Sequence, residues 1–225
     1  MLVRTLEPEV MDTVAEAVDY NSMDHSRVNR AFVDDLLAAL ASIPSPPDGT
    51  WRIFDAGTGT ALIPLELMSR DLKAIVTASD LAEQMLVIGR ENVRVAGLTN
   101  SIHLVRSDCK HLPDADASYH VAMSNSIVHH IPEPLAVLSE LWRILKPSGL
   151  LFVRDLMRPV DLQTLDHLVQ TYAGEANAHQ QRMFRESLHA AMKVSEVSDL
   201  LEKVGVPRHA VRATSDRHWT IIARK

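Results

Sequence analysis

The sequence is short of several features that define common classes of protein. A single cysteine, Cys109, excludes an intrachain disulfide and favours a reducing compartment. No stretch approaches the roughly 18 uncharged apolar residues that a membrane-spanning helix needs. Glu7, Glu9 and Asp12 lie in the N-terminal region, where a secretory signal requires an apolar run. We therefore expect a cytoplasmic protein without a membrane-spanning segment.

An excess of positive charge is also missing. Lysine and arginine total 23 residues against 29 aspartates and glutamates, which gives a formal net charge of −6. Such a chain has no general attraction to phosphate backbones, so we expect no nucleic-acid partner. The 225 residues are 46% hydrophobic and 23% charged, which is typical of a globular protein. A chain of this length buries roughly 70% of its surface on folding, and this suits one domain.

Spacings typical of metal sites are absent as well. The 11 histidines are scattered, and the sequence contains neither an HxxxH nor a CxxC pattern. Only His129 and His130 are adjacent, and no third ligand stands at a suitable distance from them along the chain. The sequence therefore predicts no metal site.

What the sequence does contain is a regular alternation of strand and helix patterns. Three prolines and a glycine within residues 43–49 end a helical N-terminal region. After this break, apolar residues recur with the period of strands and of helices in turn. The predicted strands span residues 51–55, 74–80, 101–108, 119–124, 150–154, 209–213 and 218–224. The predicted helices span residues 60–72, 82–96 and 134–145, followed by a turn at 146–149 and further helices within 156–192.

This alternation implies a parallel sheet with helices on both faces. We predict an α/β fold with a doubly wound, mostly parallel seven-stranded sheet, in which the last two strands form an antiparallel edge hairpin. Ser195 is expected to cap the last helix, which ends before Gly205. We divide this single domain into an N-terminal helical extension (1–47), a core (48–155), a helical insertion (156–192), and a C-terminal helix with the hairpin (193–225).

The most informative string, DAGTGTA, begins at Asp55 and follows the first predicted strand. Gly57 and Gly59 permit a sharp turn and a close approach of a ligand to the backbone. Thr60 is expected to cap the next helix, whose N–H groups would then face that ligand. A dinucleotide site needs a further glycine at the position of Leu62. The carboxylate of Asp55 would repel a pyrophosphate but attract a sulfonium group.

The string resembles motif I of the class I S-adenosylmethionine-dependent methyltransferases, usually D/E-x-G-x-G-x-G, with Ala61 in place of the last glycine. The resemblance implies a Rossmann-like methyltransferase fold, the cofactor S-adenosyl-L-methionine and the product S-adenosyl-L-homocysteine. In this family an acidic residue after the second strand holds the ribose hydroxyls, and another after the third strand meets the adenine. The residues implied to bind the cofactor are Asp55, Ala56, Gly57, Thr58, Gly59, Asp80, Leu81, Met85, Asp108, Cys109 and Asn125.

The run SNSIVHHIP resembles the motif IV region of small-molecule members of the family, which faces the transferred methyl group. His129 and His130 are therefore our candidate catalytic bases, because an imidazole that titrates near neutral pH can take a proton from a hydroxyl or thiol. Helix capping or packing in the core is the alternative role for each of them.

Substrate selection is expected from polar residues outside the cofactor-binding loops. Some of these lie in the N-terminal extension, which we interpret as a lid, and others lie after the fifth strand or in the helical insertion. A solvated linker and ordinary ion pairs are their alternative roles. The candidates are Tyr20, His25, Arg30, Asp155, Arg158, Gln181 and Arg185.

We therefore expect an enzyme that transfers a methyl group in line to a small-molecule acceptor. Two alternatives stay open, namely an S-adenosylmethionine-binding regulator or partner subunit without transferase activity, and a methyltransferase that acts on protein or RNA. The glycine spacing disfavours a nicotinamide-dependent oxidoreductase. The sequence does not set the oligomeric state, and a homodimer is among the assemblies it allows.

Overall fold

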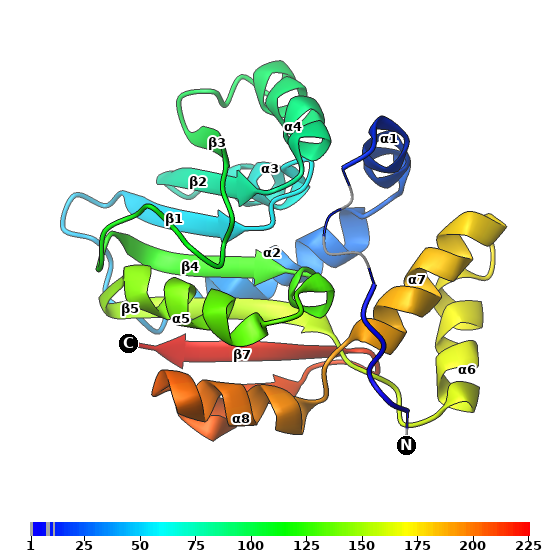
Figure 1. The fold of residues 1–225 in the computed structure, drawn as a ribbon. Coiled ribbons are helices and arrows are strands. Elements are labelled where there is room, and N and C mark those ends of the chain that lie inside the picture. The colour runs from blue at the N-terminus through cyan, green and yellow to red at the C-terminus, as the bar shows by residue number, and fades with distance from the viewer. Residues whose placement is uncertain (1, 8–9, 11) are drawn as a thin grey trace.

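A computed structural model of the chain describes residues 2–7, 10 and 12–225. Its centre is a seven-stranded sheet, shown in Figure 1. The strands are β1 (Trp51–Ala56), β2 (Ala74–Asp80), β3 (Ile102–Arg106), β4 (Tyr119–Asn125), β5 (Leu145–Leu156), β6 (Val211–Ala213) and β7 (His218–Arg224). They lie in the order β3-β2-β1-β4-β5-β7-β6. The first five are parallel, whereas β7 is antiparallel to β5 and to β6. The predicted sheet and its edge hairpin are confirmed.

Helices cover both faces of this sheet. They are α1 (Val14–Ser22), α2 (Ser26–Leu40), α3 (Leu62–Met68), α4 (Glu83–Val95), α5 (Pro134–Ile144), α6 (Leu162–Ala173), α7 (Ala178–Ala190) and α8 (Val194–Val204), with 3-10 turns η1 (Val128–His130) and η2 (Arg208–Ala210). Ile53 of β1 packs on the face covered by α2 and α3, and its neighbour Phe54 packs on the face covered by α5 and α8. Successive strand residues point to opposite faces, so the near-continuous apolar strands fill two cores. Among the described residues, no helix is both long and apolar enough to cross a membrane.

The N-terminal residues and α6–α7 lie beyond the carboxyl ends of the parallel strands (Figure 1). Two backbone hydrogen bonds tie them together: the Leu2 N–H donates to the Val160 carbonyl over 3.1 Å, and the Thr5 N–H donates to the His189 carbonyl over 3.3 Å. α1 packs on α4, and α7 packs on η1. The segments outside the core therefore gather at the edge where ligands bind in open α/β sheets.

Two helix starts differ from the prediction. α3 begins at Leu62, and the residue before it, Ala61, takes a left-handed conformation with φ of 66°. Thr60 therefore does not cap this helix, because the chain is still turning at that point. α8 is preceded by Lys193 rather than Ser195, and the Glu196 side chain accepts from the Lys193 N–H over 2.9 Å, which fixes the start two residues earlier.

The predicted turn at residues 146–149 is a local excursion within β5. Pairing with β4 passes from Tyr119 opposite Leu145 to Val121 opposite Leu150, so the intervening residues have no regular partners. Ser148 has a left-handed φ of 67°. The proline and glycine of this stretch thus interrupt the strand's pairing without ending the strand.

Candidate active site

A pocket opens at the carboxyl ends of β1, β2, β3 and β4. Of the eleven residues implied to bind the cofactor, eight line the pocket: Gly57, Gly59, Asp80, Leu81, Met85, Asp108, Cys109 and Asn125. Asp55, Ala56 and Thr58 do not line it and are nearly or fully buried in β1 and the loop that follows.

The loop after β1 is anchored to the end of β2 by backbone hydrogen bonds. The N–H groups of Gly57 and Thr58 both donate to the Ser79 carbonyl, over 2.8 and 2.9 Å. Gly57 has φ of +72°, and a Cβ atom built on it would lie 2.1 Å from Cγ2 of Ile127. Both the left-handed backbone and the missing space require glycine at this position.

Asp80 links this loop to the start of α4. Its Oδ2 accepts a hydrogen bond from the Gly59 N–H over 2.7 Å, and its Oδ1 accepts one from the Ala82 N–H over 2.9 Å. Burial raises the pKa of this carboxyl above its usual value. Each oxygen has one donor from these two groups, so acceptor capacity remains on the pocket side for two hydroxyls of a ligand.

A second carboxyl, that of Asp55, lies just beneath the loop. Burial raises the pKa of Asp55 to about 7. Its Oδ2 is buried and has no hydrogen-bond partner, and neither Asp55 nor Asp80 forms an ion pair with another described residue. Two acidic groups without a countercharge favour a positively charged ligand in this pocket.

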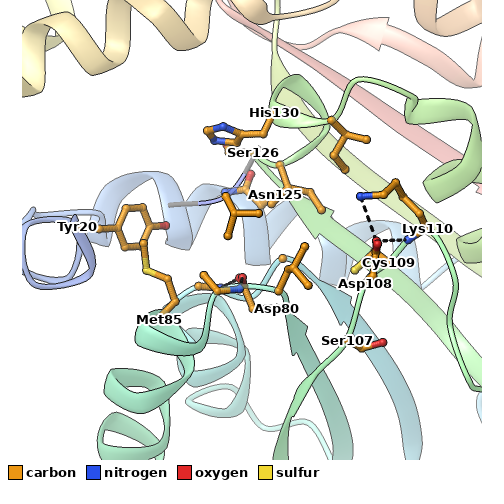
Figure 2. A pocket seen from close by; sticks show the side chains of 17 residues that line it. Tyr20, Asp80, Met85, Ser107, Asp108, Cys109, Lys110, Asn125, Ser126 and His130 are labelled. Carbon is orange, nitrogen blue, oxygen red and sulfur yellow. Dashed lines mark hydrogen bonds and ion pairs between the residues drawn. The ribbon is translucent and has the colours of Figure 1, made fainter. Parts of the chain in front are cut away.

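The residues that follow β3 form the end of the pocket that lies opposite Tyr20 (Figure 2). Asp108 Oδ1 accepts from the Lys110 N–H over 2.9 Å and lies 3.2 Å from Lys110 Nζ. Burial alone would raise the pKa of Asp108, but these Lys110 groups outweigh it and the pKa is lowered. Burial raises the pKa of Cys109 to about 12, so its thiol stays protonated and is no nucleophile.

Tyr20 and His130 reach the pocket from the side opposite Asp108 (Figure 2). Burial, reinforced by the nearby Asp80 and Asp55, raises the pKa of Tyr20 to about 12, so its phenol is protonated at neutral pH. His130 lines the pocket together with Ser126, Ile127 and Ile131. The two predicted catalytic histidines are therefore not equivalent, because His129 does not line it.

His129 is buried behind the pocket wall in a network of carboxylates. Its Nδ1 lies 2.5 Å from Asp155 Oδ1, and Asp155 Oδ2 accepts from the Val128 N–H over 2.5 Å. Burial would lower the pKa of His129, but the carboxylates of Asp155 and Glu7 outweigh it and raise the pKa. Asp155, a predicted substrate ligand, thus holds η1 in place from inside the protein.

The other predicted substrate residues lie outside the pocket lining. Arg158 forms an ion pair with Glu196, and Arg185 forms one with Asp166. The Gln181 side-chain amide donates to the carbonyls of Gly174 and Ala176, over 3.2 and 2.9 Å. The ring of His25 packs against Tyr20, with its Nε2 3.0 Å from the Tyr20 carbonyl oxygen, and Arg30 is exposed. Of the seven candidates, Tyr20 alone lines this pocket.

Sequence reasoning missed seven residues of the lining: Val10, Ala82, Ser107, Lys110, Ser126, Ile127 and Ile131. All but Val10 flank a predicted site residue or follow shortly after a strand end. Including the immediate neighbours of each predicted site residue and the first few residues after each predicted strand would have found these six. Val10 comes from the N-terminal segment, and no local pattern in the sequence points to it.

Comparisons with known proteins find similarity to methyltransferases. Residues 54–153 match the family model of a methyltransferase domain. A ubiquinone/menaquinone biosynthesis C-methyltransferase, UbiE, from Brucella anthropi is 27% identical over 218 residues, which cover 91% of this chain and 81% of the relative. The crystal structure of a SAM-dependent methyltransferase from Aquifex aeolicus superposes with a TM-score of 0.68 at 19% identity, covering 94% of this chain and 98% of that one.

A further structural neighbour was solved with the demethylated cofactor. It is phosphoethanolamine N-methyltransferase 2 from Haemonchus contortus, in complex with phosphomonomethylethanolamine and S-adenosylhomocysteine. Its TM-score is 0.64 at 15% identity, and the match covers 86% of this chain and 42% of that chain. Identities this low establish a shared fold and leave the acceptor open.

Proposed function

We propose that the chain is a class I S-adenosylmethionine-dependent methyltransferase and that its methyl acceptor is a small molecule bound in the pocket above Gly57. S-adenosylmethionine supplies an electrophilic methyl group on a sulfonium. The protein's own task is then to align the acceptor, to balance charge and to exclude water. Fixed alignment alone is worth about 7–11 kcal/mol in well-oriented reactions.

The main support for this proposal is that residues from two segments outside the cofactor-binding loops also line the pocket. Val10 and Tyr20 come from the N-terminal segment, and Ile127 and Ile131 come from the turn after β4, yet all four line the same pocket. A protein or RNA substrate needs an open groove at the carboxyl edge of the sheet. The N-terminal segment and α7 occupy that edge (Figure 1), so a small acceptor suits the site better.

The residues on the donor side fit a cationic cofactor that carries a diol. Asp80 keeps acceptor capacity beside its two backbone donors, which suits a pair of ribose hydroxyls. Asp55 is buried, and no other residue that the structure describes forms an ion pair with it, which suits a sulfonium nearby. Gly57 lines the pocket, and its missing side chain leaves room for Ile127, which lines the pocket as well. We propose that these three residues, with Asp108 at the adenine end, hold S-adenosylmethionine.

We further propose that His130, and not His129, is the base that reaches the acceptor. His130 lines the pocket, whereas His129 has Nδ1 bound by Asp155 and is buried behind the wall. The relative from Brucella anthropi is named as a C-methyltransferase of quinone biosynthesis. The acceptor class that fits such a base is an electron-rich ring carbon beside an ionisable hydroxyl. His130 would take the hydroxyl proton, and the resulting oxyanion raises electron density on the neighbouring carbon.

The proposal is tested first by cofactor binding in titration calorimetry. Substituting Asp80→Asn removes one charged acceptor of the ribose hydroxyls, and we expect S-adenosylmethionine to bind about 10- to 100-fold more weakly. Asp71→Asn changes an exposed carboxyl outside the pocket and serves as the matched control, with unchanged affinity. The acceptor is tested by release of S-adenosylhomocysteine with a panel of hydroxylated aromatic compounds, amines and thiols. Tight cofactor binding with turnover only on a protein or RNA substrate would overturn the small-molecule assignment.

A further inference from the structure

Three side chains of types that bind metal ions converge at the wall of the pocket. Glu7 comes from the N-terminal segment, whereas His129 and His130 form the end of η1. One ligand atom from each residue lies within 4.8 Å of the others. Glu7 Oε1 lies 3.4 Å from His129 Nε2 and 3.2 Å from His130 Nδ1. We propose that this cluster is a binding site for a divalent transition-metal ion, with Zn²⁺ as the best match.

The arrangement is poorly explained as an ordinary surface ion pair. The side chains of Glu7, His129 and His130 are only 11%, 4% and 17% exposed. Glu7 Oε1 is buried and makes no hydrogen bond with any other described residue, although two ring nitrogens face it. Burying a carboxylate oxygen without a hydrogen bond is costly. A cation between this oxygen and the two rings would satisfy it.

His129 is already oriented as a metal ligand. Asp155 Oδ1 lies 2.5 Å from its Nδ1, which leaves Nε2 directed toward Glu7. A carboxylate on one ring nitrogen and a metal on the other is the usual arrangement around metal-bound histidines, because the carboxylate fixes the tautomer and makes the imidazole more basic. Asp155 is itself held by the N–H groups of Val128 and Leu156, over 2.5 and 2.6 Å.

The segment that supplies Glu7 is also fixed in place. Arg4 Nε donates to the Ala190 carbonyl over 2.6 Å, and its guanidinium also donates to the carbonyls of His129 and Ile131, over 3.2 and 3.1 Å. Glu7 Oε2 accepts from the Ser187 hydroxyl over 3.3 Å. These contacts hold the carboxylate against η1, so the ligand atoms are brought together by the fold before any ion binds.

The donor set indicates the class of ion. Two imidazoles and one carboxylate suit Zn²⁺ and related first-row ions, whereas Mg²⁺ and Ca²⁺ prefer oxygen ligands alone. Three protein ligands leave at least one coordination position for another molecule. The sequence predicted no metal because it offered only the two adjacent histidines. The third ligand stands 122 positions before His129 and is brought to it by folding.

A cation at this site would border the place where the acceptor binds, because His130 belongs both to the cluster and to the pocket lining. An ion with an open position polarises an oxygen atom bound to it and lowers the pKa of a hydroxyl. With its Nδ1 on the ion, the neutral ring of His130 would carry its proton on Nε2 and could not act as the base. In the metal-bound protein the ion would take over that role, and the site would favour acceptors that carry an ionisable oxygen. This last consequence rests on the proposed function, whereas binding of the ion does not.

The test uses the full chain, freed of metal with a chelator and without any histidine tag. Zn²⁺ is titrated in the absence of S-adenosylmethionine, in competition with a coloured chelator, and we expect about one ion per chain. Glu7→Gln and His130→Asn should each weaken Zn²⁺ binding about tenfold or more. His103→Asn alters an exposed histidine on β3 and should leave Zn²⁺ binding unchanged.

Two measurements separate loss of the site from loss of the fold. Glu7 does not line the pocket, so Glu7→Gln should keep the cofactor affinity of the unsubstituted protein while it loses Zn²⁺. Co²⁺ in place of Zn²⁺ should give d–d absorption bands that weaken in the same variant. The proposal is overturned if Zn²⁺ does not bind with a stoichiometry near one, or if Glu7→Gln and His130→Asn bind it as well as His103→Asn does. Neither result would affect the methyltransferase assignment.

Discussion

The part of the pocket that we propose to hold the methyl donor (the donor half) and the part that we propose to hold the acceptor (the acceptor half) are built in different ways. The donor half, around Gly57, Asp80 and Asp108, consists of turns that directly follow three neighbouring parallel strands. The acceptor half joins Tyr20 and His130, which come from the N-terminal helices and from η1. The first is held by short backbone hydrogen bonds between adjacent strands, and the second by side chains that bridge segments far apart in sequence.

This difference has an energetic consequence. The donor loops are continuous with the most buried part of the sheet, so they are expected to open only when the protein unfolds globally. The acceptor half is held by side-chain hydrogen bonds of Arg4, Glu7 and Asp155. One of these bonds can break in a local opening while the others stay formed. A scaffold of this kind keeps the cofactor site constant and allows the acceptor site to change by substitution in a few peripheral segments.

We expect the largest effect on stability and on cofactor affinity from Gly57→Ala, because Ile127 packs closely against Gly57 in the donor half. The new Cβ atom would lie 2.1 Å from Ile127 in a backbone with φ of +72°. We expect a loss of about 2–4 kcal/mol in the free energy of unfolding. Relief of this clash displaces the loop, so cofactor affinity should fall on the order of 100-fold. Urea unfolding and titration calorimetry measure the two effects.

Gly97→Ala is the matched control for this prediction. Gly97 has φ of +71°, close to that of Gly57, but a Cβ atom there would meet no atom of the described residues within 4 Å. We expect a loss of about 1 kcal/mol from backbone strain alone and no change in cofactor affinity. If both variants bound the cofactor equally well, the close approach at Gly57 would have no part in binding.

Much of the donor half could be predicted from the sequence because its geometry is local. A strand, a glycine turn and a helix follow one another within residues 51–68, and the register of parallel strands brings the turns after β1, β2 and β3 to one edge. Asp80 and Asp108 could be placed at that edge from strand ends alone. The start of α3 could not be predicted in this way. The turn imposes a left-handed backbone conformation on Ala61, which alanine does not favour.

The acceptor half could be predicted only in outline. The sequence predicted the helical character of residues 156–192, but Arg158, Gln181 and Arg185 form ion pairs and hydrogen bonds outside the pocket. A polar residue on a helix does not reveal in its sequence context which way it faces in the folded protein. Glu7 is the clearest example, because its role depends on contacts with Ser187 and the histidines of η1.

A second prediction concerns the charge beneath the donor loop. Because burial raises the pKa of Asp55 to about 7, the folded protein holds a proton between about pH 4 and 7 that the unfolded chain has released. The free energy of unfolding should therefore fall as the pH rises through this range. Asp55→Asn removes this dependence, so the variant should gain on the order of 2–4 kcal/mol relative to the unsubstituted protein between pH 5 and pH 8.

Cofactor binding should respond to the same carboxyl in the opposite direction. An ionised Asp55 attracts the sulfonium, so the affinity of the unsubstituted protein for S-adenosylmethionine should rise from pH 5 to pH 8, and that of Asp55→Asn should rise less. Asp71→Asn, in the exposed turn before β2, should follow the unsubstituted protein in both measurements. Parallel pH profiles for the protein and for Asp55→Asn would mean that Asp55 is already ionised at pH 5.

The smallest of these effects is expected on the acceptor side, from Arg4→Ala. The substitution removes three hydrogen bonds that join the N-terminal segment to α7 and to the backbone of η1, and we expect a loss of about 1–3 kcal/mol in the free energy of unfolding. Arg27→Ala, at an exposed position of α2, should change the free energy of unfolding by less than about 0.5 kcal/mol.

Hydrogen exchange should quicken at residues 128–131 in Arg4→Ala. The amides of Gly57 and Thr58 should stay protected, because they donate to the Ser79 carbonyl. Cofactor affinity should stay within about threefold. If exchange at Gly57 quickened as much as at His130, the two halves of the pocket would be one cooperative unit, and the acceptor site could not change independently of the cofactor site.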